Sequence, residues 1–226
     1  MDTSKLSPLT QDCLQKLMRV WFDFERQLGR VGIISRLDNE QFTHDDYLKL
    51  LLNLRQQVIE GGRWIARTAS SFDKHYADIR CLIIEHAAEE CRDYKVLEND
   101  FLMAGGKQSQ IEQQSRNIGT EALHAFLMHR ASQKNPVDLI GAMWIIEGLG
   151  QKMASQWAAL IEQTLEIENC TKFMRYHGEN DDRHMEKLYL ILDSICQSPD
   201  NVQDIERTAR VVAKLYALQL EEIDYA

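Results

Sequence analysis

Two histidines and an aspartate recur at metal-ligand spacing in the segment RYHGENDDRHMEKLY, residues 175–189. His177, Asp181 and His184 form an H-x3-D-x2-H pattern. A helix turns about 100° per residue, so offsets of 0, 4 and 7 place the three side chains within roughly 60° of one another. Neutral imidazole nitrogen and carboxylate oxygen suit iron, manganese or zinc. The segment therefore predicts part of a metal site.

A solvated acidic helix face is the alternative reading of the same segment. The chain has seven histidines in 226 residues, so such spacings also arise by chance, and GENDDR is highly charged. Against this reading stands Gly178, which directly follows His177 and is a poor helix former. A glycine at that place is hard to explain if the segment serves packing alone.

A second cluster with the same offsets lies in the segment IIEHAAEECRDYKVLEND. His86, Glu90 and Asp93 again stand at positions 0, 4 and 7, so a continuous helix would present them on one face. The alternative is an exposed acidic face, because Glu85, Glu89 and Glu98 are close by in the sequence.

One more carboxylate stands in an apolar context, Glu147 in the segment WIIEGLG. Burying a carboxylate is costly unless it is paired or bound to a cation. An arginine partner or a capping role would also account for it. Carboxylates and histidines that project from facing helices are how helical bundles build two-metal sites, and three predicted helices here offer such residues.

The elements that must position these residues are predicted to be helices throughout. Only three prolines occur, apolar residues recur at helical spacing, and no strand alternation is present. We expect a single all-α domain over residues 1–226 with about seven helices. Their expected ranges are 8–35, 43–68 with a break or kink at the double glycine 61–62, 73–103, 108–133, 136–167, 172–196 and 202–224.

Composition narrows the classes of function. The net charge of −9 argues against a nucleic-acid partner, which would require a basic surface. The five cysteines include no CxxC pair, which predicts reduced thiols in a cytoplasmic protein. The first residues are polar, unlike a signal peptide, and no apolar run reaches the length of a membrane span, so no membrane partner is expected.

The segments LHAFLMHRASQKNPVDLIGAMWIIEGLG and YHGENDDRH resemble the haem-oxygenase-like superfamily, and within it the non-haem di-iron oxidases and oxygenases. The resemblance covers residues 42–195. In that group a glutamate precedes an H-x3-D-x2-H pattern by about thirty residues, as Glu147 precedes His177, Asp181 and His184 here. The resemblance implies a haem-oxygenase-like bundle, two iron ions or one iron and one manganese, and a homodimer.

The second cluster, His86, Glu90 and Asp93, departs from the family pattern, which places a glutamate and then a histidine seven residues later. Here His86 and Asp93 occupy those positions with the residue types exchanged, or Glu90 supplies the glutamate at the shorter spacing of three. The exchange affects the second ion and hence the oxidase chemistry that depends on it.

Other members of the superfamily match less well. Haem oxygenase takes a proximal histidine from its first helix, whereas the first histidine here, His44, follows that helix, so no haem is expected. The cysteine nucleophile and nearby tyrosines of thiaminase II, the TenA family, find no matching set here. Pyrroloquinoline-quinone synthase shares the fold without a metal, so the fold alone leaves the function open.

The resemblance implies an oxidase or oxygenase that acts on a small organic substrate with O₂ and an electron donor that the residues do not name. Two alternatives stay open: a metal-free cofactor-biosynthesis enzyme or small-molecule binding protein of the same fold, and a regulatory or scaffolding helical protein. A substrate pocket would draw on apolar residues that are equally plausible as plain core, namely Met143, Trp144, Phe126 or Phe173.

Overall fold

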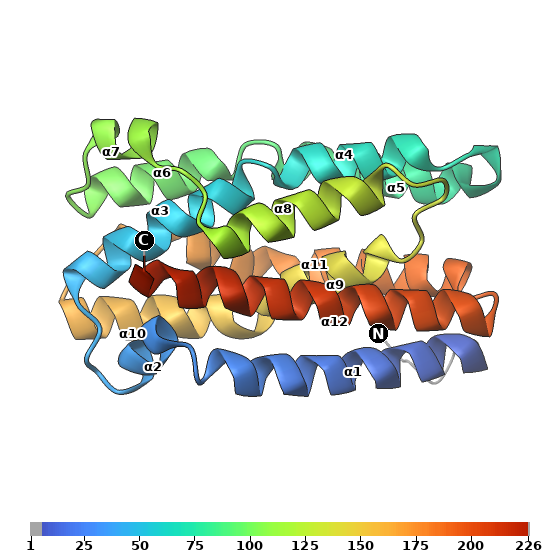
Figure 1. Cartoon of the computed structure of the whole chain (residues 1–226), viewed down its shortest axis with the longest axis horizontal. Coiled ribbons are helices and arrows are strands. Elements are labelled where there is room, and N and C mark those ends of the chain that lie inside the picture. The colour runs from blue at the N-terminus through green and yellow to red at the C-terminus, as the bar shows by residue number, and fades with distance from the viewer. Residues whose placement is uncertain (1–5, 226) are drawn as a thin grey trace.

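The structure is a computed structural model that describes residues 6–225, with the side chains of residues 180–182 outside the description. All regular structure in this part of the chain is helical (Figure 1). The α-helices are α1 (Pro8–Leu28), α2 (Gly32–Asp38), α3 (His44–Val58), α4 (Gly61–Ser71), α5 (Ala77–Glu90), α6 (Tyr94–Met103), α7 (Gln108–Gln113), α8 (Ile118–Ala131), α9 (Leu139–Leu149), α10 (Ser155–Leu165), α11 (Lys172–Ile195) and α12 (Pro199–Glu221).

The all-α prediction is confirmed, and several local signals act as expected. Thr43 caps α3, and its hydroxyl and the Asp46 side chain form a reciprocal capping box. The expected break lies at residues 59–60, directly before the double glycine 61–62 that begins α4. Gly105 has a φ of 90°, the left-handed conformation that ends α6. The helix predicted over residues 172–196 is α11, almost without change.

The predicted number of about seven helices is wrong, because several long predicted helices are interrupted. The range 8–35 divides into α1 and α2, and 108–133 divides into α7 and α8. The range 73–103 breaks at a turn over residues 91–93, between α5 and α6. The range 136–167 begins only at Leu139, and a π-helical turn, Gly150–Ala154, joins α9 to α10.

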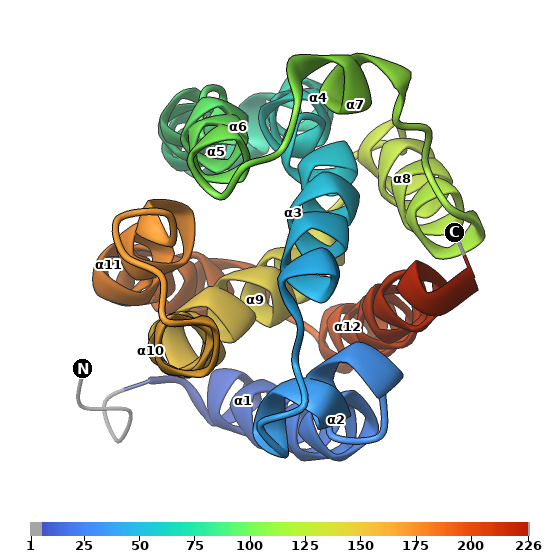
Figure 2. The same cartoon turned by 90° about the vertical axis from the view of Figure 1, so that its left-hand side faces the viewer.

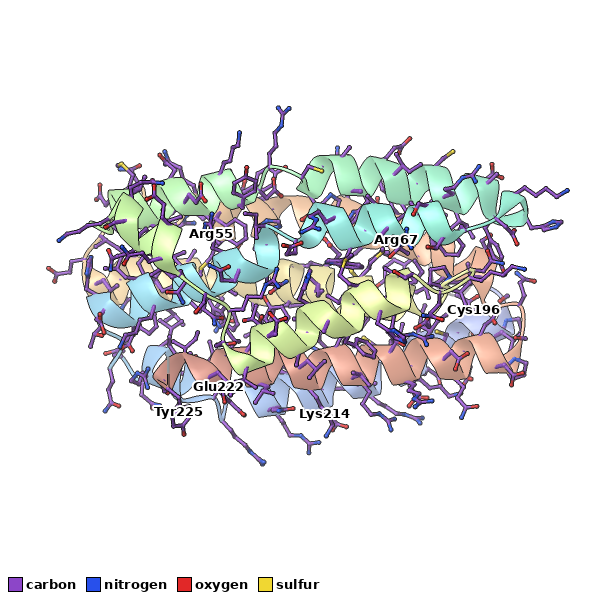
Figure 3. All side chains as sticks on the ribbon, turned by 45° about the horizontal axis from the view of Figure 1, so that its top comes forward. Arg55, Arg67, Cys196, Lys214, Glu222 and Tyr225 are labelled. Atoms are coloured by element: carbon purple, nitrogen blue, oxygen red, sulfur yellow. The ribbon has the colours of Figure 1, made fainter. Side chains whose placement is uncertain are left out.

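Helix α9 lies in the middle of the bundle, surrounded by α3, α10, α11 and α12 when the molecule is seen end-on (Figure 2). Its sequence LIGAMWIIEGL is apolar on all sides, and ten of its eleven residues are buried. A helix that is hydrophobic all round is stable only in the interior. Nitrogen- and oxygen-tipped side chains such as Lys214 project from the outer faces of the bundle instead (Figure 3).

The start of α11 is held by a residue from another helix. The side chain of Thr171, at the N-cap position, makes no capping bond. Instead the buried Asp100 of α6 accepts a hydrogen bond from the backbone N–H of Phe173 at 2.7 Å. Just before the helix, the Tyr47 hydroxyl donates to the carbonyl of Cys170. These contacts fix α11 relative to α3 and α6.

Gly178 has a packing role, contrary to the argument from its poor helix propensity. A Cβ at this position would lie 1.9 Å from the Ser155 hydroxyl oxygen and 3.0 Å from the Ser155 backbone nitrogen. The glycine therefore lets α11 approach the first residue of α10 closely. Helix α11 is continuous through this position.

No helix among residues 6–225 has both the length and the hydrophobicity that a membrane crossing requires.

Substitution of Gly141 by alanine should destabilise the protein, because a Cβ there would lie 2.2 Å from the backbone carbonyl oxygen of Ile205 and would push α9 away from α12. We expect a loss of about 1–3 kcal/mol in the free energy of unfolding, measured by chemical denaturation of the metal-free protein. Gly61→Ala is the matched control, since nothing lies within 4 Å of its Cβ position. Equal stability of the two variants would contradict the close crossing.

Candidate metal centre

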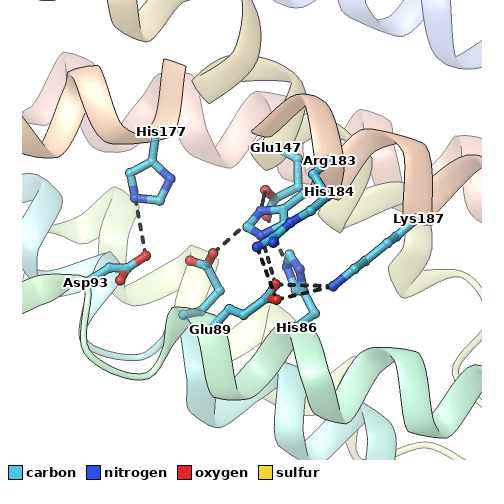
Figure 4. Close-up of polar contacts among 9 residues, drawn as sticks. His86, Glu89, Asp93, Glu147, His177, Arg183, His184 and Lys187 are labelled. Atoms are coloured by element: carbon cyan, nitrogen blue, oxygen red, sulfur yellow. Dashed lines mark hydrogen bonds and ion pairs between the residues drawn. The ribbon is translucent and has the colours of Figure 1, made fainter. Parts of the chain in front are cut away.

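Four side chains from three helices converge in the interior between α5, α9 and α11 (Figure 4). We call them group one: His86 and Glu90 from α5, Glu147 from α9 and His184 from α11. Each offers one ligand atom, and these atoms lie within 4.8 Å of one another. Glu147 is the centre of the contacts, with one oxygen 2.9 Å from His184 Nδ1 and the other 3.2 Å from His86 Nε2.

A second set, group two, consists of Glu90, Asp93 and His177, and its ligand atoms also lie within 4.8 Å of one another. Within group two, His177 Nε2 lies 3.5 Å from a carboxylate oxygen of Asp93. Glu90 belongs to both groups. The two groups are therefore adjacent and share one carboxylate, which is the arrangement expected of a two-metal carboxylate site.

His177 and His184 belong to different groups, although their common face on one predicted helix, and the match of both to the H-x3-D-x2-H pattern, led us to expect that they anchor one ion. They do share a face of α11, but seven residues also advance about 10 Å along a helix axis. Ligands of one ion can be no more than about 4.4 Å apart at ordinary metal–ligand distances. A spacing of two helical turns therefore places the two imidazoles on the same face of α11 but at different positions along its axis.

Asp93 is positioned by a turn that the sequence analysis did not expect. Helix α5 ends at Glu90, and Asp93 stands at the N-cap position of α6 after the turn at residues 91–93. It is buried there with 8 % of its surface exposed. Asp181, the remaining predicted ligand, lies outside the described side chains. Among the predicted ligands whose side chains are described, all six are in group one or group two.

Glu147 is ionised inside the protein. Burial alone would raise its pKa, but hydrogen bonds to His184 and His86 outweigh burial and lower the pKa of Glu147 to about 2. The pKa of His86 is raised: burial opposes its charge, and the bond to Glu147 more than compensates. Neither an arginine partner nor a capping role for Glu147 is found among the described residues. Its partners there are the two imidazoles of group one.

Glu90 has the opposite electrostatic character. Burial, and then the nearby charge of Glu147, raises the pKa of Glu90 to about 7. Its Oε1 atom is buried without a hydrogen-bond partner and lies 3.8 Å from His184 Nδ1. A buried acceptor without a hydrogen-bond partner is unfavourable. A cation beside Glu90 would offset this cost and the repulsion between the charges of Glu90 and Glu147. The donors of the two groups, carboxylate oxygens and imidazole nitrogens, fit iron or manganese.

Glu89 is part of this arrangement, although the sequence analysis counted it only as a sign of an exposed face. One of its carboxylate oxygens lies 3.0 Å from Nε2 of His184. The available signal was the offset of three residues from His86, because residues three apart on a helix are neighbours on its surface.

A cavity of about 90 Å³ adjoins both groups, with Glu90, Glu147 and His177 in its wall. The π-helical turn contributes Gly150 and Ala154 to the lining, and such turns are frequent beside functional sites. Of the four residues expected to line a pocket, Phe173 does so, whereas Met143 and Trp144 are 1 % exposed in the core and Phe126 packs against that core. The rest of the lining is mostly apolar, including Leu54, Trp64, Ile65 and Met174.

The raised pKa of Glu90 gives a test of this electrostatic arrangement in metal-free protein. The pKa of Glu90 is about 7 in the folded protein and 4.5 in the unfolded chain. The folded protein therefore binds this proton more tightly, and rising pH lowers the free energy of unfolding between these two values. The variant Glu90→Gln lacks this titration. Its stability relative to the native protein should rise from pH 5 to pH 8 by at most about 3 kcal/mol.

The stability of both proteins is measured by urea denaturation at each pH. Glu85→Gln is the control, because Glu85 is exposed on the same helix. A difference between Glu90→Gln and the native protein that is constant with pH would show that Glu90 is ionised as easily in the folded chain as in the unfolded one.

Solved structures share this fold over nearly the whole chain. One is a domain of unknown function with a heme oxygenase-like fold from Shewanella denitrificans OS217, which is 19% identical, with a TM-score of 0.87, and covers 94% of this chain and 92% of its own. A TenA homolog from Pseudomonas syringae pv. tomato DC3000 is 12% identical over 100% of this chain and 96% of its own, with a TM-score of 0.77. A TenA homologue from P. horikoshii OT3 is 14% identical over 93% and 97%, with a TM-score of 0.74.

These identities show a common fold and no more. No curated protein matches the chain. The family of iron-containing redox enzymes, by contrast, matches residues 62–217, a range that includes every described residue of group one and group two. The chain therefore belongs to the haem-oxygenase-like family of iron-containing redox enzymes.

Proposed function

We propose that group one and group two each hold a metal ion, two irons or an iron and a manganese, and that the protein is an O₂-dependent oxidase or oxygenase of a small organic molecule. The observation that carries this proposal is the sharing of Glu90 by two adjacent groups of metal-ligand type, whose residues are all buried or half-buried. Iron in these groups would supply the one-electron chemistry that O₂ requires.

The residues of the chain have separate tasks in this proposal. Glu147 enters the site already ionised, because His86 and His184 hold its charge. Glu90 would have to be deprotonated to hold a cation, and its carboxylate is shared by both groups. Group one would have two imidazoles, whereas the described ligands of group two include one imidazole and two carboxylates.

The adjoining cavity defines where the substrate would lie. Its apolar lining would exclude water and hold a hydrocarbon portion of the substrate, and the wall formed by Glu90, Glu147 and His177 brings that portion to both groups. The family membership supports iron redox chemistry.

A metal-free enzyme or binding protein is the second candidate, and one observation favours it. Two of the four residues of group one already have polar partners on both sides, with Glu147 between two imidazoles and His184 between two carboxylates. Two of the solved structures with this fold are TenA homologues. A site that serves as an internal ion-pair network would have the same contacts.

Metal analysis distinguishes the two candidates. Protein produced with iron, then desalted, should contain about two ions per chain by elemental analysis. Asp93→Ala removes a ligand of group two only and His86→Ala a ligand of group one only, so each should retain about one ion. Glu90→Ala should retain less than one, because it removes a ligand from both groups at once.

Glu85→Ala, on the exposed side of α5, is the matched control and should match the native protein. Addition of Fe²⁺ to the metal-free native protein in air should also consume O₂ faster than addition to the Glu90→Ala variant. Native protein without bound metal, and unable to take up Fe²⁺ or Mn²⁺, would favour the metal-free candidate.

A further inference from the structure

Both ring nitrogens of His184 face carboxylates, and the two carboxylates differ in their surroundings. Nδ1 lies 2.9 Å from Glu147, inside group one, and Nε2 lies 3.0 Å from Glu89, on the other side of the ring. His184 itself is only 2 % exposed. Figure 4 shows the imidazole between these carboxylates, with Glu89 on the side of Lys187.

Glu89 is held in place by two cations from α11. Lys187 Nζ lies 3.3 and 3.4 Å from its two carboxylate oxygens, and an Arg183 nitrogen lies 3.2 Å from one of them. Burial alone would raise the pKa of Glu89, but the bond and charge of Lys187 lower it. Glu89 is therefore a fixed anionic acceptor at the edge of the site, tied to the helix that carries His184.

A neutral imidazole has one N–H group and one lone pair, and only the lone pair can bind a metal. If Glu89 accepts a hydrogen bond from Nε2–H, Nδ1 is the nitrogen that can bind the ion. Without metal Nδ1 can carry a proton toward Glu147, and a cation would take the place of that proton. Nδ1 lies 2.9 Å from Glu147 and 3.8 Å from Glu90. These are the two carboxylates of group one. The opposite tautomer would turn the lone pair toward Glu89 and away from the proposed ion.

We propose that Glu89 is the positioning residue of group one: it holds His184 in the Nε2–H form, so that Nδ1 is available as a metal ligand, while Lys187 holds Glu89. This inference rests on the proposed function for its metal. It makes Glu89 a partner of the ligand and no ligand itself, in the manner of carboxylate–histidine–metal arrangements.

The alternative is that Glu89, Lys187 and Arg183 form an ordinary surface ion-pair network. Exposed pairs of this kind contribute little to stability, and the Arg183 side chain is 62 % exposed. A network without a positioning role would leave the metal affinity and the tautomer of His184 unchanged when Glu89 is replaced. These two measurements therefore separate the alternatives.

The first measurement is the affinity of group one for Co²⁺, followed by its visible absorption. It is made in the Asp93→Ala background, which lacks a ligand of group two, so that one site remains. In this background, the further substitution Glu89→Ala should weaken Co²⁺ binding about 10- to 100-fold. Addition of Glu89→Gln, whose amide oxygen still accepts the bond, should give an intermediate loss. Lys187→Met should weaken binding less than Glu89→Ala, since Glu89 remains present.

Two exposed residues serve as controls in the same background. Glu85→Ala removes an exposed carboxylate of the same helix, and Lys95→Met removes an exposed lysine of α6; neither should change the affinity. Thermal unfolding of each variant without metal identifies any loss that arises from poor folding. Unchanged Co²⁺ affinity in a folded Glu89→Ala variant would overturn the positioning role, while the metal site itself would stand.

The second measurement needs no metal and so tests the inference even if the protein binds none. The ¹⁵N chemical shifts of histidine-labelled protein report which ring nitrogen of His184 carries the proton, with His184→Gln to assign the signal. The metal-free native protein should carry a proton on Nε2, whether or not Nδ1 also carries one toward Glu147, and Glu89→Ala should shift the population toward the neutral Nδ1–H form. A native His184 in the neutral Nδ1–H form would overturn the proposal.

Discussion

The site depends on a carboxylate that is buried in the most hydrophobic helix of the molecule. Helix α9 lies in the centre of the bundle, and Glu147 is the acidic residue among its apolar neighbours. The cost of removing this charge from water is large, and it is met by two imidazoles that come from α5 and α11. Those helices must therefore lie on the same side of α9, and the Asp100 contact and the Gly178–Ser155 approach hold α11 there.

Much of the fold was predictable because its signals are local. Periodic apolar residues identify helices, and their ends are marked by the Thr43 hydroxyl, the Pro8 ring and the left-handed backbone of Gly105. The interruptions were missed for a physical reason: the turn at residues 91–93 and the π-helical turn at Gly150–Ala154 contain no proline, and a single glycine such as Gly150 is tolerated within a helix. Tertiary packing decides such breaks, and packing is not visible in a window of sequence.

The candidate ligands were also predictable, whereas their grouping was not. Helical periodicity describes the angle around the axis, so it correctly placed His177 and His184 on one face. Periodicity does not show which ligands would hold the same ion. That assignment depends on the distance along the helix axis and on the residues of the neighbouring helix. Glu89 was missed because it is one of several acidic residues in that segment, and only the contact with His184 distinguishes it from Glu85. That these residues bind metal stays a prediction.

The sharing of Glu90 by both groups means that the two sites cannot fill independently. The first cation would displace the proton that Glu90 holds near neutral pH and fix the carboxylate in the charged form. The second cation would then meet a ligand that is already deprotonated and oriented, and it would also meet the positive charge of the first cation. By thermodynamic reciprocity the same coupling free energy acts in both directions. The metal affinity of either site would therefore depend on whether the other site is filled, so the loss of a ligand from one group would also change the affinity of the other.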